Sequence, residues 1–305
     1  MIRLRRYSGN PILTGREGVW WDSKYAYNAG AAIHEGKVHL LYRAEGDEKR
    51  KDIETRFPVS RLGLAISRNG YEIDERPTGF ALGGEGPEEL WGVEDPRVTK
   101  IGDTYYIVYV QVAPPRNPTA DHSHLALATT KDFRTYTRHG QLMPEIPQRT
   151  SGLLPEKVNG KYVLIHRIRP NMQIAYSEDL VAWRDSRTLM AVRPGKWDSN
   201  FIGIGAQPLK TEKGWLLFYH GTDADRVYRL GAAWLDLDDP SKILARLEEP
   251  ILEPDAPYEA KGLTPNVAYA CGAVELNGEF LVYYGGADAV LGVASIGVEE
   301  LLRAV

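Results

Sequence analysis

The chain is poor in cysteine and has no long apolar run, and both shortages restrict what it can be. Cys271 is the single cysteine among 305 residues, which excludes an internal disulfide framework and a zinc site built from several cysteines. It lies in the small apolar run 268–274, which predicts a buried and unreactive thiol. No apolar stretch approaches the length of a membrane span, and the basic start 1–6 has no apolar segment behind it. We therefore expect a cytoplasmic protein with no membrane partner.

The sequence also lacks the short motifs of several enzyme classes. It has no glycine-rich phosphate loop between a strand and a helix, no histidine pair at helical spacing, and no serine in a nucleophile elbow. We expect no metal and no organic cofactor. The net charge of −4 gives no electrostatic reason to expect nucleic acid as a partner. Any anion site must therefore be a local group of basic residues.

The chain does contain a pattern that occurs five times. Each copy has an apolar strand, a tight turn with glycine, and a second strand rich in aromatic and branched residues. The predicted hairpins span 31–43, 98–109, 156–167, 208–220 and 273–284. Two of them turn at Asn159-Gly160 and Asn277-Gly278, and Asn-Gly between alternating strands is a strong hairpin signal.

Further strands are predicted after each hairpin. Small residues alternate with apolar ones at 62–67, 125–129, 172–177, 230–234 and 291–295. Outer elements follow in the first four copies, at 78–82, 140–143, 188–192 and 250–252. The chain ends in a short helix-like segment, 298–304, and 10–13 is expected to supply the missing outer strand. The pattern predicts an all-β fold, a single-domain five-bladed β-propeller over 1–305 whose N-terminal strand closes the last blade.

The segment 91–97 gathers three charged side chains around Pro96. The proline predicts an extended conformation for Asp95. Adjacent carboxylates on extended backbone point to opposite sides, so Glu94 and Asp95 are expected to have different roles. The alternative is a purely structural strand start with a local pair between Asp95 and Arg97.

In a propeller, the start of strand one and the end of strand two of each blade lie at the same face. Polar residues gather at those positions: Asn28, 94–97, 149–151 and Asn266 at strand starts, and 43–45, 166–167, 220–223 and Asp288 at strand ends. We therefore expect an active site at that face. Structural roles remain open for some members, because Arg43 and Arg97 suit pairing with the carboxylates, and His166 and His220 suit hydrogen bonding in the core.

The chemistry of these residues favours a carbohydrate substrate. The chain has 17 tyrosines and 7 tryptophans, and aromatic rings line sugar clefts as well as β-sheet cores. Trp20-Trp21 and Trp197 remain open between these two roles. A carboxylic acid in such a cleft can protonate the leaving oxygen of a glycosidic bond. A hydrolase needs a second carboxylate to activate water, whereas a phosphorylase needs cations to hold phosphate, and the basic residues favour phosphate.

Eight segments span nearly the whole chain in order: 27–31, 41–45, 92–97, 155–162, 166–167, 202–208, 214–221 and 284–288. On these segments the sequence resembles glycoside hydrolase family 130, the inverting β-mannoside phosphorylases and related β-mannosidases. The resemblance implies the five-bladed propeller already expected from the repeat. The chain departs from the family pattern at one place. Many members have Lys followed by Asn or Asp there, whereas this chain has Arg149-Thr150, in which Arg149 keeps the positive charge.

The resemblance also implies roles for individual residues. It makes Asp95 the general acid, whose proton is relayed through the 3-hydroxyl of the mannosyl unit while phosphate attacks C1 and gives α-mannose 1-phosphate. The implied mannosyl ligands are Asn28, Arg43, His166 and Asp288, with Glu94 as a neighbour that binds or orients the sugar. The implied phosphate ligands are Arg149, Arg167 and His220.

Retention of these three basic residues favours phosphorolysis, because hydrolytic members of the family lack most of them. The expected substrates are a β-1,2- or β-1,4-linked mannooligosaccharide, or a mannosyl-GlcNAc, together with inorganic phosphate. The alternatives are an inverting β-mannosidase on the same scaffold and a non-catalytic glycan-binding propeller. Leaving-group specificity is expected in the loops 45–60 and 114–121. The oligomeric state, a homo-oligomer included, is left open.

Overall fold

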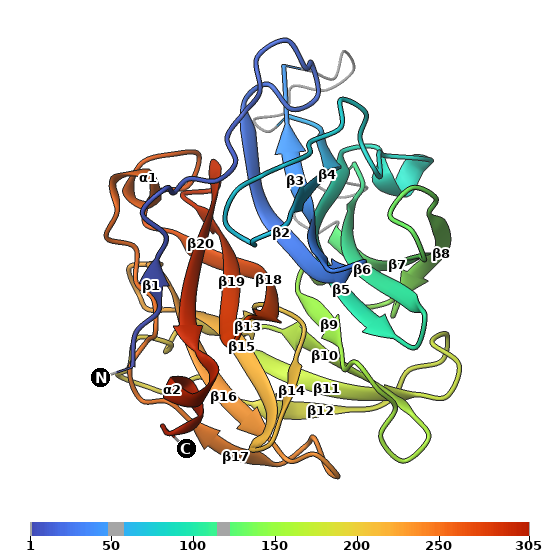
Figure 1. The fold of residues 1–305 in the computed structure, drawn as a ribbon. Helices are drawn as coiled ribbons and strands as arrows, with labels where there is room; N and C mark the ends of the chain where they lie inside the picture. Colours follow the sequence, from blue (N-terminus) through green and yellow to red (C-terminus); the bar gives the residue numbers. More distant parts are fainter. Residues whose placement is uncertain (1, 48–57, 115–122, 305) are drawn as a thin grey trace.

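The computed structural model describes residues 2–47, 58–114 and 123–304, and within them the chain is almost entirely β-structure (Figure 1). The strands form five antiparallel sets in chain order, as the repeat predicts. Set 1 is β2 (Tyr25–His34), β3 (Lys37–Glu45) and β4 (Ser60–Ser67). Set 2 is β5 (Gly92–Ile101), β6 (Thr104–Val112), β7 (Ser123–Thr130) and β8 (Thr137–Leu142). Set 3 is β9 (Ser151–Leu153), β10 (Tyr162–Ile168), β11 (Asn171–Ser177) and β12 (Arg184–Met190).

Set 4 is β13 (Phe201–Ile204), β14 (Leu209–Thr211), β15 (Gly214–Thr222), β16 (Tyr228–Leu235) and β17 (Ile243–Arg246). Set 5 is β18 (Ala268–Leu276), β19 (Glu279–Gly286) and β20 (Val290–Gly297), joined by β1 (Arg5–Arg6) from the N-terminus. Sets 1 and 2 share one sheet through a single parallel pair, Ser60 with Gly92. The helical segments are η1 (Pro87–Glu89), α1 (Pro257–Ala260) and α2 (Val298–Leu302). No helix in the described ranges is long and apolar enough to span a membrane.

The hairpin turns form where the glycines predict them. At Asn277-Gly278, φ is +52° and +79°, the geometry of a two-residue type I′ turn. Asn159-Gly160 has the same geometry, with φ of +51° and +79°, but the strand predicted ahead of it is wrong. Val158 there forms only an isolated bridge, and set 3 takes its first strand from β9 instead. Pro155 interrupts that segment because proline has no N–H to donate to a ladder.

The predicted outer elements 140–143 and 188–192 overlap β8 and β12, whereas the other two are shifted. The segments 78–82 and 250–252 contribute only isolated bridges, from Leu82 and Leu252, and β17 is the outer strand of set 4. The N-terminal segment does join set 5, where β1 pairs with β20 and the predicted segment 10–13 adds one bridge from Leu13. Outer strands have one pairing partner, so their position depends on the tertiary neighbourhood more than on their own sequence.

The apolar core lies between neighbouring sets. Separate clusters of buried side chains join set 1 to set 2, set 2 to set 3, set 3 to set 4 and set 4 to set 5. A fifth cluster joins set 5 back to set 1, where Leu281 and Tyr283 of β19 pack with Leu40 and Tyr42 of β3. The first strands of the sets approach so closely that a Cβ on Gly272 of β18 would collide with the backbone of β2.

Candidate active site

The polar residues predicted at strand starts and strand ends of sets 1 and 2 form a connected group around Arg43. Arg43 Nη1 lies 2.9 Å from Glu94 Oε2 and 3.5 Å from Asp95 Oδ1. Its Nη2 lies 2.6 Å from Glu45 Oε1. Asn28 Nδ2 donates a hydrogen bond to Asp95 Oδ1 at 2.9 Å. The structure thus brings together the predicted acid and three of its predicted sugar-binding neighbours.

Two equivalent β-bulges position Asp95 and Asn28. The register between β5 and β6 shifts between positions 94 and 97, and the register between β2 and β3 shifts between positions 27 and 30. At the bulges φ is +49° for Asp95 and +47° for Asn28. Aspartate and asparagine tolerate this left-handed conformation better than most residues. The bulges re-aim the two side chains so that they meet.

Two predictions for this segment are wrong. Asp95 is not extended, because the bulge sets its backbone in spite of the Pro96 that follows. Glu94 and Asp95 do not point to opposite sides, because both carboxylates contact Nη1 of Arg43. A bulge adds one residue to a strand and breaks its strict alternation.

The charges of this group are mutually stabilising. Burial opposes the charge on Arg43, but Glu94 and the other acidic groups around it raise the pKa of Arg43 well above its ordinary value. Glu45, one of the carboxylates expected to pair with Arg43, does so, is fully buried and also accepts hydrogen bonds from Tyr27 and Ser60. Its spacing of two residues from Arg43 places both on one side of β3, and that spacing is the signal in the sequence.

Arg149 joins the group from the segment that leads into β9. Its Nη1 lies 2.8 Å from Glu94 Oε2, so Glu94 bridges the guanidinium groups of Arg43 and Arg149. This contact connects the residues expected to bind sugar with those expected to bind phosphate.

Arg167 and His220 form the second part of the site, near the ends of β10 and β15. Both are buried, and Arg167 Nη1 lies 3.4 Å from His220 Nε2. Burial, with the charges of Arg169 and Arg149, lowers the pKa of Arg167. Burial and the neighbouring Arg167 hold the pKa of His220 well below its ordinary value, so the imidazole is neutral. In the described part of the chain, Arg167 forms no ion pair with a carboxylate.

One buried hydroxyl group, that of Thr150, lies close to this pair, and the next residue, Ser151, carries a second buried hydroxyl group on the strand partner of His166. Neither Thr150 Oγ1 nor Ser151 Oγ has a hydrogen-bond partner among the described residues. A Cβ on Gly203 would lie 2.8 Å from Thr150 Oγ1 and 2.7 Å from His220 Nε2. The Thr150 hydroxyl and the His220 ring therefore face the same small space. Buried polar groups normally have partners, and an anion in this space would accept a hydrogen bond from the Thr150 hydroxyl. The sequence placed this segment at a strand start, but only burial singles out the two hydroxyls.

His166 lies outside both groups. Its Nδ1 is 2.9 Å from Gln148 Oε1 and its Nε2 is 3.1 Å from Ser186 Oγ. Burial lowers the pKa of His166 to about 4, so the ring is neutral at physiological pH. Both ring nitrogens are occupied by protein partners, and the assignment of His166 as a substrate ligand stays a prediction.

Asp288 follows β19 and is electrostatically part of the Arg43 group. Burial raises the pKa of Asp288 to about 6, against a hydrogen bond with Thr264 and the charge of Arg43. The charges of Asp95 and Glu45 add to the rise. Its backbone is left-handed, with φ of +52°. The Asp288 carboxyl group therefore keeps its proton up to about pH 6.

Arg97 has a structural role. It is buried and donates hydrogen bonds to the backbone carbonyls of Asp95 at 2.9 Å and Gly205 at 3.0 Å, and to Tyr269 Oη at 2.9 Å. The predicted pairing with a neighbouring carboxylate side chain is replaced by these contacts. Arg97 therefore ties the bulge of β5 to sets 4 and 5.

The tryptophans left open by the sequence separate into two kinds. Trp21 is buried against Tyr42, and Trp197 stacks on Tyr219, so both pack within the protein. Trp20 is 54% exposed, with the guanidinium of Arg61 4.6 Å from its ring centre. The loops expected to choose the leaving group, 45–60 and 114–121, lie largely outside the described residues.

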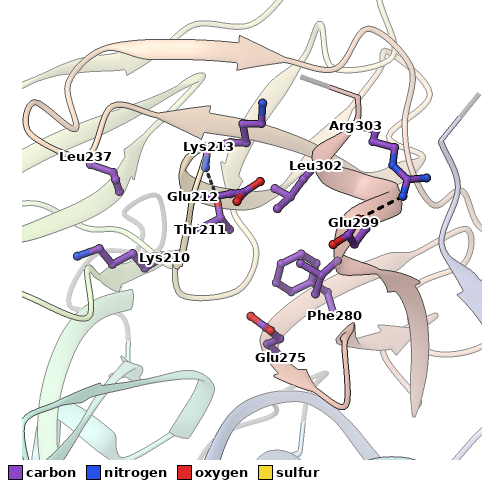
Figure 2. Close-up of a pocket in the computed structure, with 11 residues that line it drawn as sticks. Lys210, Thr211, Glu212, Lys213, Leu237, Glu275, Phe280, Glu299, Leu302 and Arg303 are labelled. Atoms are coloured by element: carbon purple, nitrogen blue, oxygen red, sulfur yellow. Dashed lines mark hydrogen bonds and ion pairs between the residues drawn. The ribbon is translucent and has the colours of Figure 1, made fainter.

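A separate cavity of about 770 Å³ lies at the other end of the strands (Figure 2). The turn between β14 and β15 and the helix α2 border it, and Lys210, Glu275 and Arg303 are among its lining residues. Lys210 and Arg303 are already paired with acidic side chains. The described residues contain no group of three or more His, Cys, Asp or Glu side chains able to hold a metal ion. The Arg43 and Arg167 groups are therefore the best candidate for an active site.

Comparison with known proteins identifies relatives over the whole chain. The model of glycoside hydrolase family 130, described as beta-1,4-mannooligosaccharide phosphorylase, matches residues 4–305. A 1,2-beta-oligomannan phosphorylase and a beta-1,2-mannobiose phosphorylase of Thermoanaerobacter sp. (strain X514) are 39% and 44% identical to the chain. Each alignment covers 99% of this chain and 99% of the relative.

Solved structures show the same likeness. The beta-1,2-mannobiose phosphorylase from Listeria innocua, in complex with beta-1,2-mannobiose, superposes with a TM-score of 0.87 at 30% identity, over 98% of both chains. A structure from work on family members that are glycoside hydrolases targeting beta-1,2 mannosidic linkages in Candida mannan also has a TM-score of 0.87, at 26% identity, over 98% of this chain and 94% of that one.

Proposed function

The chain belongs to glycoside hydrolase family 130, and on that basis we propose that it catalyses inverting phosphorolysis of a β-mannoside, with inorganic phosphate as co-substrate and α-mannose 1-phosphate as product. The reaction transfers a mannosyl group to phosphate. The two relatives at 39% and 44% identity, both named for β-1,2-linked substrates, favour a β-1,2 linkage.

The proposed acid is Asp95. Its proton reaches the glycosidic oxygen through the 3-hydroxyl of the mannosyl unit, the C1–O bond breaks, and a phosphate oxygen forms the new bond to C1 from the opposite face. Asn28 orients the Asp95 carboxyl group through their 2.9 Å hydrogen bond. Arg43, Glu94 and Asp288 line the mannosyl site in this proposal.

The observation that favours phosphorolysis over hydrolysis is that Arg167 is buried without a carboxylate partner among the described residues. A buried guanidinium without a carboxylate partner is unfavourable unless an anion binds to it, and guanidinium forks suit phosphate. An inverting hydrolase instead needs a second carboxylate to activate water. The neutral His220 and the unpartnered hydroxyl of Thr150 supply further hydrogen-bonding groups to the same space. We assign phosphate to this space, with Arg149 at its border with the sugar site.

We also propose that the five sets are the blades of a five-bladed β-propeller. The continuous series of apolar clusters supports this, since set 5 packs back on set 1. The pairing of β1 with β20 supports it as well, because it joins the first and last parts of the chain.

The test is to incubate the protein with β-1,2-mannobiose with and without inorganic phosphate, and to measure mannose 1-phosphate and free mannose by anion-exchange chromatography. We expect mannose 1-phosphate only with phosphate, and a much slower reaction with β-1,4-mannobiose. Treatment with EDTA is expected to leave the rate unchanged.

Hydrolysis is the second candidate, because the same fold carries hydrolases at 26% identity. Free mannose formed at the same rate without phosphate would establish it and overturn the proposal. Binding of β-mannobiose without any cleavage would instead support a glycan-binding role.

A further inference from the structure

Four of the five sets contain the same buried triad. In each, a tyrosine on the second long strand donates a hydrogen bond to a carboxylate that is at most 1% exposed, and an arginine pairs with that carboxylate. The triads are Tyr42–Asp22–Arg76, Tyr109–Glu89–Arg138, Tyr219–Asp198–Arg246 and Tyr284–Glu259–Arg6. The tyrosine–carboxylate distances are 2.7–2.9 Å. Each carboxylate is the buried member, and its arginine is the more exposed one.

Set 3 has a neutral triad at this place. His166 occupies the tyrosine position of β10, Gln148 replaces the carboxylate and Ser186 replaces the arginine. In sets 1, 3 and 4 the next residue along the strand belongs to the candidate site: Arg43 after Tyr42, Arg167 after His166 and His220 after Tyr219. This shared spacing places His166 at the same position as the tyrosines. Set 3 has therefore lost both charges of the triad while keeping its hydrogen bonds.

The neutral triad lies in the same set as Arg167, the cation that has no carboxylate partner in the described part of the chain. Arg43 has carboxylate partners, His220 is neutral, and the matching residues of sets 2 and 5, Val110 and Gly285, carry no charge. Among the described residues at this position, Arg167 is the one cation without a carboxylate. The set that carries it is the one in which the buried carboxylate of the triad is replaced by an amide.

We propose that Gln148 is a positioning residue that sets anion affinity, because its neutral amide holds His166 without bringing a buried negative charge near Arg167 and Arg149. The inference rests on the proposed function, since the anion is the phosphate of that reaction. His166 then acts through the backbone of β10, by fixing the strand that presents Arg167, and not by contact with the sugar.

The test compares Gln148→Glu with wild type in the phosphorolysis assay at about pH 8, where an imidazole is mostly neutral. A unit negative charge within about 10 Å of a bound anion, at an effective dielectric constant of about 20, weakens anion binding by about tenfold or more. We expect the KM for phosphate to rise about tenfold or more, with the KM for β-1,2-mannobiose changed less than twofold. Gln148→Glu combined with Ser186→Arg rebuilds the charge balance of the other sets. This double variant should reverse at least half of the rise in the phosphate KM, measured on a logarithmic scale.

Glu259→Gln is the matched control, because it makes the reverse exchange in set 5. It should lower Tm and leave the ratio of the two KM values unchanged. Ser186 is exposed, so Ser186→Asp provides a second variant if Gln148→Glu does not fold, and it should raise the phosphate KM by a smaller factor.

The outcomes separate the two proposals. Wild-type enzyme that cleaves equally well without phosphate would overturn the proposed function. A phosphate-dependent wild type whose phosphate KM changes less than twofold in Gln148→Glu, or in Ser186→Asp where that variant is used, would overturn only the role of Gln148. Equal rises in both KM values, unrelieved by Ser186→Arg, would mean that the variant damages packing, and would also overturn it.

Discussion

Replacement of Arg43 with methionine tests whether one buried cation holds the acidic residues of the site together. The side chain is 11% exposed and lies 2.6 Å from Glu45 Oε1, 2.9 Å from Glu94 Oε2 and 3.5 Å from Asp95 Oδ1. Methionine preserves the apolar length of the side chain and removes the charge. Three carboxylates would then share a buried space, with Arg149 remaining on Glu94.

The expected loss follows from these distances. Opposite charges about 3 Å apart attract by about 5 kcal/mol at an effective dielectric constant of about 20, and removal of one partner of a buried pair costs about 3–5 kcal/mol. With an unfolding entropy of about 2.1 cal/mol/K per residue, a 305-residue chain loses about 6 °C in Tm for a loss of about 4 kcal/mol.

Calorimetric unfolding as a function of pH is the assay. The carboxylates left without a cation can be neutralised by protons, so the destabilisation should be greatest at neutral pH and shrink towards about pH 4. Arg138→Met is the matched control, because Arg138 contacts Glu89 at 3.6 Å and Glu89 keeps hydrogen bonds from Tyr109 and Gln111. A loss below about 1 kcal/mol at neutral pH, or one that is independent of pH, would refute the reasoning.

Three further predictions concern the roles of single residues. Asp95→Asn should lower kcat by at least about 10²-fold and change Tm little, because asparagine accepts the hydrogen bond of Asn28 and tolerates a φ of +49°; an unfolded variant in circular dichroism would contradict this. Arg167→Met should raise the KM for phosphate more than that for β-mannobiose, and equal rises would count against its role. Asp288→Asn should stabilise the protein above pH 6 by up to about 3 kcal/mol, because burial raises the pKa of Asp288 from 3.8 to about 6 and its ionisation therefore costs stability as pH rises through that range. That gain in stability should vanish near pH 4. The variant should also have a higher KM for the mannoside. A variant less stable than wild type at every pH would contradict the prediction.

Local sequence was sufficient for four of the five predicted hairpins, and the hairpin at 156–167 was the exception because set 3 takes its first strand from β9. Asn-Gly turns and alternating apolar residues act over a few positions, so their structural effect is visible without knowledge of distant partners. The recurrence of the pattern then predicted that strand starts and strand ends would meet, and the structure brings Asn28, Arg43, Glu94 and Asp95 together. The outer elements were less predictable, because their pairing partners lie in other parts of the chain.

Residue patterns within a few positions of one another account for the all-β repeat, the glycine turns and the residue types available at the site. The use of those residues depends on how the strands pack. Two bulges turned Asp95 and Asn28 toward each other against the expected alternation. Arg43 acquired three acidic neighbours, whereas Arg167 received none among the described residues. Bulges and ion pairs depend on strands that are distant in sequence, and burial then decides which charges are stabilised and which remain available to an anion.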